Sequence, residues 1–143
     1  MNADLHCHSN VSDGLLSPRA LVQRAHENGV TLLALTDHDE LAGLSEARAA
    51  AEEFGVRFLD GVEISVSWGN DQTIHVVGLG VDPDYAVLDT GLAQLRGGRD
   101  ARARRMAQAL AEAGIAGAYE GALRYAGNPA LVGRSHFARY IVE

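Results

Sequence analysis

The chain has 143 residues, of which 47% are hydrophobic and 22% charged, and its formal net charge is −7. This size and composition favour one folded domain over a disordered chain, and no apolar run approaches the roughly 18 residues that a membrane span needs. The polar start, Met1 to Asp4, lacks a signal-peptide pattern, and the single cysteine, Cys7, excludes an internal disulfide. We therefore expect a cytoplasmic protein with no membrane partner.

The first third of the chain predicts a strand, a helix and a second strand. Residues 3–8 form the first predicted strand, which runs into a polar loop. Ser17 followed by Pro18 predicts a helix start, with the hydroxyl as N-cap and proline at the first helical position. Gly29 should end this helix, and the apolar run 30–35 should form a buried strand.

The same alternation continues through the next segments. Asp39 can cap a second helix over about 40–54, which Gly55 would close. A third strand is expected over 56–65 and a fourth over 73–79. Alternating strands and helices are typical of a parallel α/β sheet or barrel.

The character of the sequence changes after residue 82. Residues 85–127 are rich in alanine and arginine at helical spacing, and predict two or three helices with breaks near 114–117 and at 128–129. We therefore divide the chain into a strand-rich part, 1–82, and a helical part, 83–143.

Charge is unevenly distributed between the two ends. Residues 1–95 hold 15 acids and 4 arginines, whereas residues 96–143 hold 4 acids and 8 arginines. Acids that ligate metal ions are neutralised by them, so the arginine-rich end could meet an anionic substrate. A solvated helix face remains the simpler interpretation for most of these arginines.

His6 and His8 lie two residues apart on the first predicted strand. Their side chains should share one face while Cys7 points to the other. Two imidazoles on one face, with Cα atoms about 6–7 Å apart, can clamp a metal ion. Such a pair also occurs by coincidence, so the motif alone does not establish a metal site.

Further polar residues follow or interrupt the apolar strands. The segment 36–39 (TDHD) lies at the carboxyl end of a buried strand, where α/β proteins place their sites. Asp39 is readily explained as a helix cap and Asp37 as a turn residue, whereas His38 has no such structural explanation. Glu63 lies inside an apolar strand, and a buried carboxylate there needs a metal or a cation.

Two more residues complete a possible ligand set. His75 lies in a hydrophobic strand and alone would be interpreted as a core histidine, and Asp13 alone would be a turn residue. Four histidines and two carboxylates on successive strands are the donors that divalent ions prefer. We therefore predict a metal site formed by His6, His8, Asp13, His38, Glu63 and His75.

Five short motifs also carry a family resemblance: DLHCHS (4–9), SDG (12–14), TDHD (36–39), GVEIS (61–65) and HVVG (75–78). Together they resemble the PHP (polymerase and histidinol phosphatase) family. Within it, the chain is most similar to bacterial nucleoside 3′,5′-bisphosphate phosphatases and to 5′–3′ exoribonucleases that act on short RNA. The segments 96–105 and 133–139 also resemble that subgroup.

The resemblance implies an α/β fold, the N-terminal half of a distorted (βα)7 barrel followed by a helical insertion subdomain. It implies up to three divalent ions, Mn²⁺ first, with Zn²⁺ or Fe²⁺ as alternatives. His6, His8 and Glu63 would hold the first ion, Asp13 and His38 the second, and Glu63 with His75 the third. In many family members a histidine stands in place of Asp13. Arg134 and His136 match positions that contact substrate phosphate.

The implied activity is hydrolysis of a phosphate monoester by metal-activated hydroxide. The expected substrate is the 3′-phosphate of a nucleoside 3′,5′-bisphosphate or the end of a short oligoribonucleotide, with no duplex DNA as partner. The family also has a later Ala-His-Pro histidine and an Asp-x-His pair, which residues 1–143 do not contain. We therefore expect the missing C-terminal half to come from the same gene or from a second chain.

The sequence leaves two alternative functions open. An amidohydrolase also opens with His-x-His on a strand, although the TDHD and GVE segments argue against it. A non-catalytic metal module, like PHP domains that stabilise polymerases, is the second alternative, and the intact ligand set argues against it.

Overall fold

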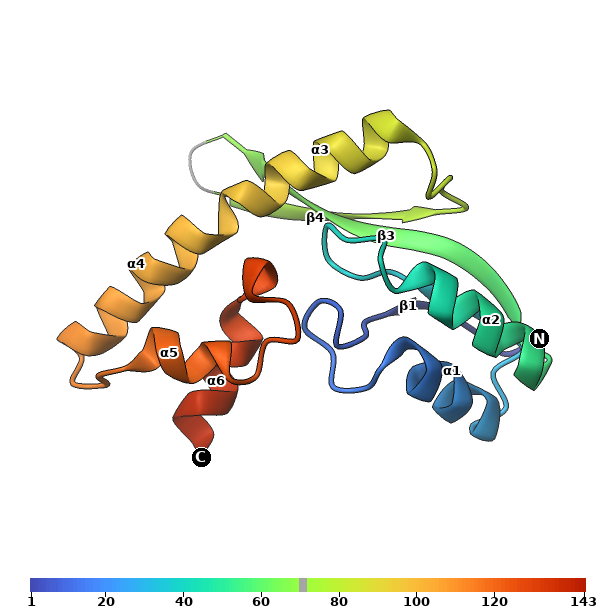
Figure 1. The fold of residues 1–143 in the computed structure, drawn as a ribbon, viewed down its shortest axis with the longest axis horizontal. Helices are drawn as coiled ribbons and strands as arrows, with labels where there is room; N and C mark the ends of the chain where they lie inside the picture. The colour runs from blue at the N-terminus through green and yellow to red at the C-terminus, as the bar shows by residue number, and fades with distance from the viewer. Residues whose placement is uncertain (70–71) are drawn as a thin grey trace.

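The computed structural model describes residues 1–69 and 72–143. The fold is α/β, and the described strands form one sheet in the order β1-β2-β3-β4: β1 Ala3–Cys7, β2 Leu32–Leu35, β3 Arg57–Trp68 and β4 Gln72–Leu79. β1, β2 and β3 run parallel, whereas β4 pairs antiparallel with β3. Figure 1 shows the long β3–β4 hairpin extending and curving beyond the two shorter strands.

The alternation of elements predicted a parallel sheet, which β1 to β3 confirm. β4 departs from that pattern for a simple geometric reason. Only three residues separate Trp68 from Gln72, whereas a parallel crossover needs about a dozen or more. The fourth strand must therefore return as a hairpin.

Two helices pack against the strands at the N-terminal end of the chain, α1 Pro18–Glu27 and α2 Leu44–Phe54 (Figure 1). The Ser17 hydroxyl accepts from the Ala20 amide at 3.2 Å, as the predicted cap requires. Both helices present small or branched side chains to the strands. The shared core comprises Val22, Ala25, Leu33, Leu35, Leu44, Ala47, Ala50, Ala51 and Val56.

The prediction that Asp39 caps a helix beginning at residue 40 is wrong. α2 begins at Leu44, and its N-cap is Gly43, which has no side chain to cap with. Asp39 is fully buried and adopts a φ of +50°, an uncommon conformation for a residue other than glycine. Its carboxylate is engaged in tertiary contacts and is not free to cap a helix.

Helices make up the rest of the described chain: α3 Ala86–Gly97, α4 Arg99–Glu112, α5 Ala118–Leu123, the 3₁₀ turn η1 Pro129–Leu131 and α6 Arg134–Val142. The three helices α3, α4 and α5 confirm the predicted count, and the break between α4 and α5 includes the predicted 114–117, whereas the break at Gly98 was not predicted. In Figure 1, α3 lies beside the β3–β4 hairpin and α4 leads away from it towards α5 and α6. α4, α5 and α6 share a second core around Ala103, Ala122 and Phe137.

The exposed side of the sheet is unusually apolar. Trp68, Ile74, Val76, Val77 and Leu79, on the β3–β4 hairpin, are each between 37% and 70% exposed. Adjacent apolar residues on a strand face opposite sides, so both faces of β4 offer apolar surface. Within the described residues, no helix combines the length and apolarity of a membrane span.

Candidate metal centre

The sheet brings all six predicted side chains to one place. β1, β2 and β3 are parallel, so their carboxyl ends meet at the same edge of the sheet. His6 lies on β1 and His8 directly follows it. His38 follows β2 and makes an isolated bridge to Glu63 on β3. His75 lies opposite Ser65 in the antiparallel pair, which places it on the same face as Glu63.

The carboxylate of Glu63 lies at the centre of the group and is only 6% exposed. Its oxygens lie 2.9 Å from His6 Nε2, 3.0 Å from His8 Nε2, 3.1 Å from His75 Nδ1 and 3.5 Å from His38 Nδ1. Asp13 lies at the rim, 3.7 Å from His8 Nδ1 and 3.9 Å from His38 Nε2. One carboxylate therefore contacts four imidazoles.

These side chains form three overlapping groups in which one donor atom from each member lies within 4.8 Å of the others. The groups are His6, His8, Glu63; His8, Asp13, His38; and His38, Glu63, His75. Because the groups share members, they outline several adjacent candidate ion positions rather than one isolated site. Imidazole and carboxylate are donors that Mn²⁺, Fe²⁺ and Zn²⁺ accept.

Two buried atoms support the same conclusion. His8 Nδ1 and His38 Nδ1 are buried without a hydrogen-bond partner among the described residues, as is His136 Nε2 outside the cluster. Buried polar atoms normally have partners, and an orphaned imidazole nitrogen is explained by an ion or a water. The residues present therefore fit a metal centre.

The protonation states suit metal binding. Burial lowers the pKa of His38 despite the opposing effect of Glu63 and Asp13, so the ring is neutral at pH 7. Burial would raise the pKa of Glu63, but the hydrogen bond from His6 and the nearby His38 and His8 lower it overall. Glu63 is therefore ionised, and both groups offer lone pairs without first losing a proton.

Cys7 takes no part in this cluster. Its thiol points to the other face of β1, as predicted, and donates to the Ala34 carbonyl at 3.2 Å. Burial, with Asp4 and Asp37 nearby, raises the pKa of Cys7 to about 12. It remains a thiol at neutral pH and is a poor metal ligand.

Asp37 shapes the loop that carries Asp13. Its buried carboxylate accepts from the Ser9 amide at 2.8 Å, and from the hydroxyls of Ser9 and Ser12 at 2.6 Å each. The loop has room only for glycine at position 14, because a Cβ there would lie 2.2 Å from the His8 carbonyl oxygen. The interpretation of Asp37 as a turn residue was therefore too local, since it connects two segments 25 or more residues apart.

Arg134 and His136, the two predicted substrate residues, differ in exposure. Arg134 is exposed at the first residue of α6. His136 is 1% exposed, and its Nδ1 accepts from the Gly133 amide at 3.0 Å. Burial, with Arg139 and Arg99 nearby, lowers the pKa of His136, so it is neutral. In this arrangement His136 holds the start of α6 and does not reach the surface.

α6 is attached to the loop that carries Asp13. Ser135 Oγ lies 3.1 Å from Asp13 Oδ2, and Arg139 donates to the Asp13 carbonyl at 2.8 Å. The exposed Arg134 directly precedes Ser135 in this helix.

Nine described residues line a cavity of about 310 Å³ beside the cluster. They are Asp39, Ser65, Ser67, Gln94, Leu95, Gly98, Arg99, Arg102 and Arg105. Its three arginines recur every third residue of α4, a spacing that places them on one face and was readable in the sequence. Burial, with the cations Arg99 and Arg134 nearby, lowers the pKa of Arg102. Such a cavity would attract an anion.

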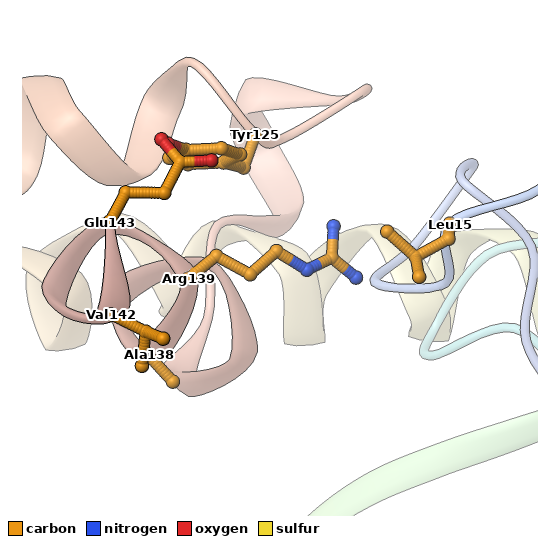
Figure 2. A pocket seen from close by; sticks show the side chains of 6 residues that line it. All are labelled: Leu15, Tyr125, Ala138, Arg139, Val142 and Glu143. Carbon is orange, nitrogen blue, oxygen red and sulfur yellow. The ribbon is translucent and has the colours of Figure 1, made fainter.

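A second hollow, of about 480 Å³, lies between α6 and the loop after β1. Figure 2 shows the Arg139 side chain extending from α6 towards Leu15, with Tyr125 and Glu143 at the other end. The lining is mainly apolar and contains none of the six clustered side chains.

Known proteins with similar sequences include phosphatases and exoribonucleases. The PHP domain model matches residues 4–88. A 3′,5′-nucleoside bisphosphate phosphatase of Chromobacterium violaceum is 52% identical over 99% of this chain and 50% of its own length. A 5′-3′ exoribonuclease of Haemophilus influenzae is 46% identical over 98% of this chain and 50% of its own length.

A solved structure shows the same fold. It is that of an amidohydrolase from Chromobacterium violaceum with bound sulfate and no metal, with a TM-score of 0.95 and 52% identity over 99% of this chain and 50% of that one. The chain thus spans about half the length of the relatives it matches.

Proposed function

This chain belongs to the PHP family, and we propose that it provides the metal centre of a phosphoesterase that hydrolyses phosphate monoesters. The observation that carries the proposal is the convergence of four histidines and two carboxylates beside an arginine-lined cavity. Such a donor set suits divalent ions, and the neighbouring cations suit a phosphorylated substrate. The names of the phosphatase and exoribonuclease relatives support the same reaction class.

We assign the ions as the family resemblance implies. His6, His8 and Glu63 would hold the first, Asp13 and His38 the second, and Glu63 with His75 the third. Mn²⁺ is the proposed ion, and Zn²⁺ or Fe²⁺ would accept the same donors. The chemistry that divalent ions supply in such a centre is Lewis-acid activation of water and of the phosphate ester.

The proposed substrate is a nucleoside 3′,5′-bisphosphate, attacked at its 3′-phosphate, or the end of a short oligoribonucleotide. In this proposal the metal centre binds the scissile phosphate, and Arg102 with Arg134 binds a second one. Arginine suits the second role because its planar fork binds phosphate through two hydrogen bonds. Glu63 and the histidines are held by the sheet, so they need little rearrangement to act.

The proposal is tested with the protein as its gene encodes it. Phosphate release from a nucleoside 3′,5′-bisphosphate is measured with Mn²⁺ and again after chelation. We expect turnover that chelator removes and Mn²⁺ restores. Mn²⁺ binding without turnover would favour the non-catalytic module, and cleavage of an amide bond in place of the ester would favour the amidohydrolase.

Arg134 should distinguish a bisphosphate from a simple phosphate ester. Because one charge-assisted contact contributes about 1.5–3 kcal/mol, Arg134→Ala should lower kcat/KM on the bisphosphate by about ten-fold or more. An aryl phosphate has no second anion to hold, so its kcat/KM should change much less. Steady-state kinetics on both substrates measure the difference.

Arg104→Ala is the matched control for this comparison. Arg104 also lies in the arginine-rich part, but it is exposed and pairs with Asp100 at 2.8 Å. Its loss should leave both substrates unaffected. Equal losses on both substrates in Arg134→Ala would place Arg134 at the reacting phosphate, and no loss on either would remove it from the site.

A further inference from the structure

The helical part is attached to the strand-rich part through polar contacts that fall on the metal-centre loops. Ser135 and Arg139 contact Asp13. Arg96 donates to the Asp39 carbonyl at 2.7 Å, and Arg99 binds the Asp39 carboxylate. Asp13 belongs to the proposed ligand set, and Asp39 directly follows His38. The helices thus contact the segments that hold the proposed ligands.

Asp39 joins the two strands that carry His38 and Glu63. Its amide donates to the Glu63 carbonyl at 2.9 Å, and its Oδ1 accepts from the Ser65 amide at 2.7 Å. These contacts extend the pairing with β3 beyond the end of β2, where the His38 to Glu63 bridge lies. Asp39 adopts its left-handed backbone conformation at this point, which costs free energy unless surrounding contacts hold it.

Arg99 provides those contacts from α4. Its Nε and Nη2 donate to Asp39 Oδ2 at 3.0 and 2.5 Å, and Nη2 also donates to Ser65 Oγ at 3.0 Å. Asp39 is 0% exposed and Arg99 is 7% exposed. A buried carboxylate needs a partner, and among the described residues Arg99 is the cation that forms an ion pair with this one.

We propose that Arg99 is a positioning residue of the metal centre, acting through Asp39. It neutralises Asp39, which in turn fixes the separation of His38 and Glu63. This rests on the proposed metal-dependent function, because it assumes that those two side chains bind ions. Both oxygens of Asp39 are already occupied within the protein, so Asp39 supports the ligands and is not one of them.

The first measurement is Mn²⁺ affinity, by calorimetry, in the protein as its gene encodes it and without substrate. Arg99→Met should weaken binding by about 10- to 100-fold, as loss of a group that supports ligands does. Arg99→Lys keeps the charge and should retain part of the affinity. Asp39→Asn added to Arg99→Met should cause little further loss, because both act through one contact. Arg104→Met, on the exposed side of α4, should bind Mn²⁺ as the wild type does.

The second measurement needs no metal. The Ser65 amide donates to Asp39, so its hydrogen exchange in metal-free protein should be faster in Arg99→Met and unchanged in Arg104→Met. Circular dichroism shows whether each variant is folded. If Arg99→Met does not fold, Arg99→Lys and the double variant provide the same comparison.

The outcomes separate this inference from the proposed function. Wild-type Mn²⁺ affinity and unchanged Ser65 exchange in a folded Arg99→Met would overturn the positioning role. A higher KM for the bisphosphate with wild-type Mn²⁺ affinity would also overturn it, since Arg99 would then contact substrate. Failure of the wild type to bind Mn²⁺ would overturn the metal centre itself, whatever the exchange rates.

Discussion

Replacing Glu63 by glutamine is expected to remove most Mn²⁺ binding and to lower kcat/KM by about 1,000-fold or more, equivalent to about 4 kcal/mol. The Glu63 carboxylate lies within 3.5 Å of four histidine nitrogens. Glutamine has nearly the same shape but is neutral, so it can neither offset ion charge nor bridge two ions. Calorimetry with Mn²⁺ and phosphate-release kinetics measure the two effects.

The control for this variant is Glu112→Gln. Glu112 lies on the exposed surface of α4, where it accepts from Gln108 at 3.2 Å. Its replacement should change neither metal affinity nor rate. Glu63→Gln should stay folded, because the side chain keeps its size and one of its two accepting oxygens. A folded Glu63→Gln protein with wild-type Mn²⁺ affinity would exclude Glu63 from the ligand set.

The sequence predicted the strand-rich part well because local rules and tertiary structure agree there. Ser17 and Pro18 mark a helix start by their own chemistry, and the structure shows Ser17 as N-cap. The meeting of His6, His38 and Glu63 follows from parallel strands, whose carboxyl ends share one edge. The proximity of these side chains was therefore predictable, and their role as ligands remains a proposal.

Residues whose partners lie far along the chain were not predictable in this way. Asp39 satisfies the local rule for a helix cap, yet Arg99, 60 residues away, binds its carboxylate. Only the tertiary fold shows that a buried arginine binds the carboxylate that local rules assign to a helix cap. His136 is similar, since its neighbour in the motif, Arg134, is exposed and the motif says nothing about which of them is buried.

The arginine-lined cavity was predictable only in part. The every-third-residue spacing of Arg99, Arg102 and Arg105 predicts a shared helix face, but not what that face meets. In the structure it meets Ser65 and Ser67, which lie on the same face of β3 as Glu63. Arg99, at the start of α4, reaches β3 through Ser65, so a basic helix face lines a cavity beside the histidine cluster.

The last prediction is that residues 1–143 alone bind Mn²⁺ weakly and turn over little substrate. The proposed assignment gives the first ion three protein donors and the other two ions two each. The family resemblance implies further ligands in the half that this chain does not span. Adding that half, as a second chain or in one polypeptide, should raise Mn²⁺ affinity by about 100-fold or more, or about 2.8 kcal/mol.

The apolar surface of the hairpin gives the same experiment a second readout. Trp68, Ile74 and Val76 are 42–70% exposed, and such a patch normally packs against other protein. With the added half, Trp68 fluorescence should shift to the blue and the binding of an apolar dye should fall. A matched double variant, Ile74→Thr with Val76→Thr, should weaken association of the two halves without touching the proposed ligands. Full phosphatase activity from residues 1–143 alone would contradict this prediction, because it would show that the six clustered side chains suffice for catalysis.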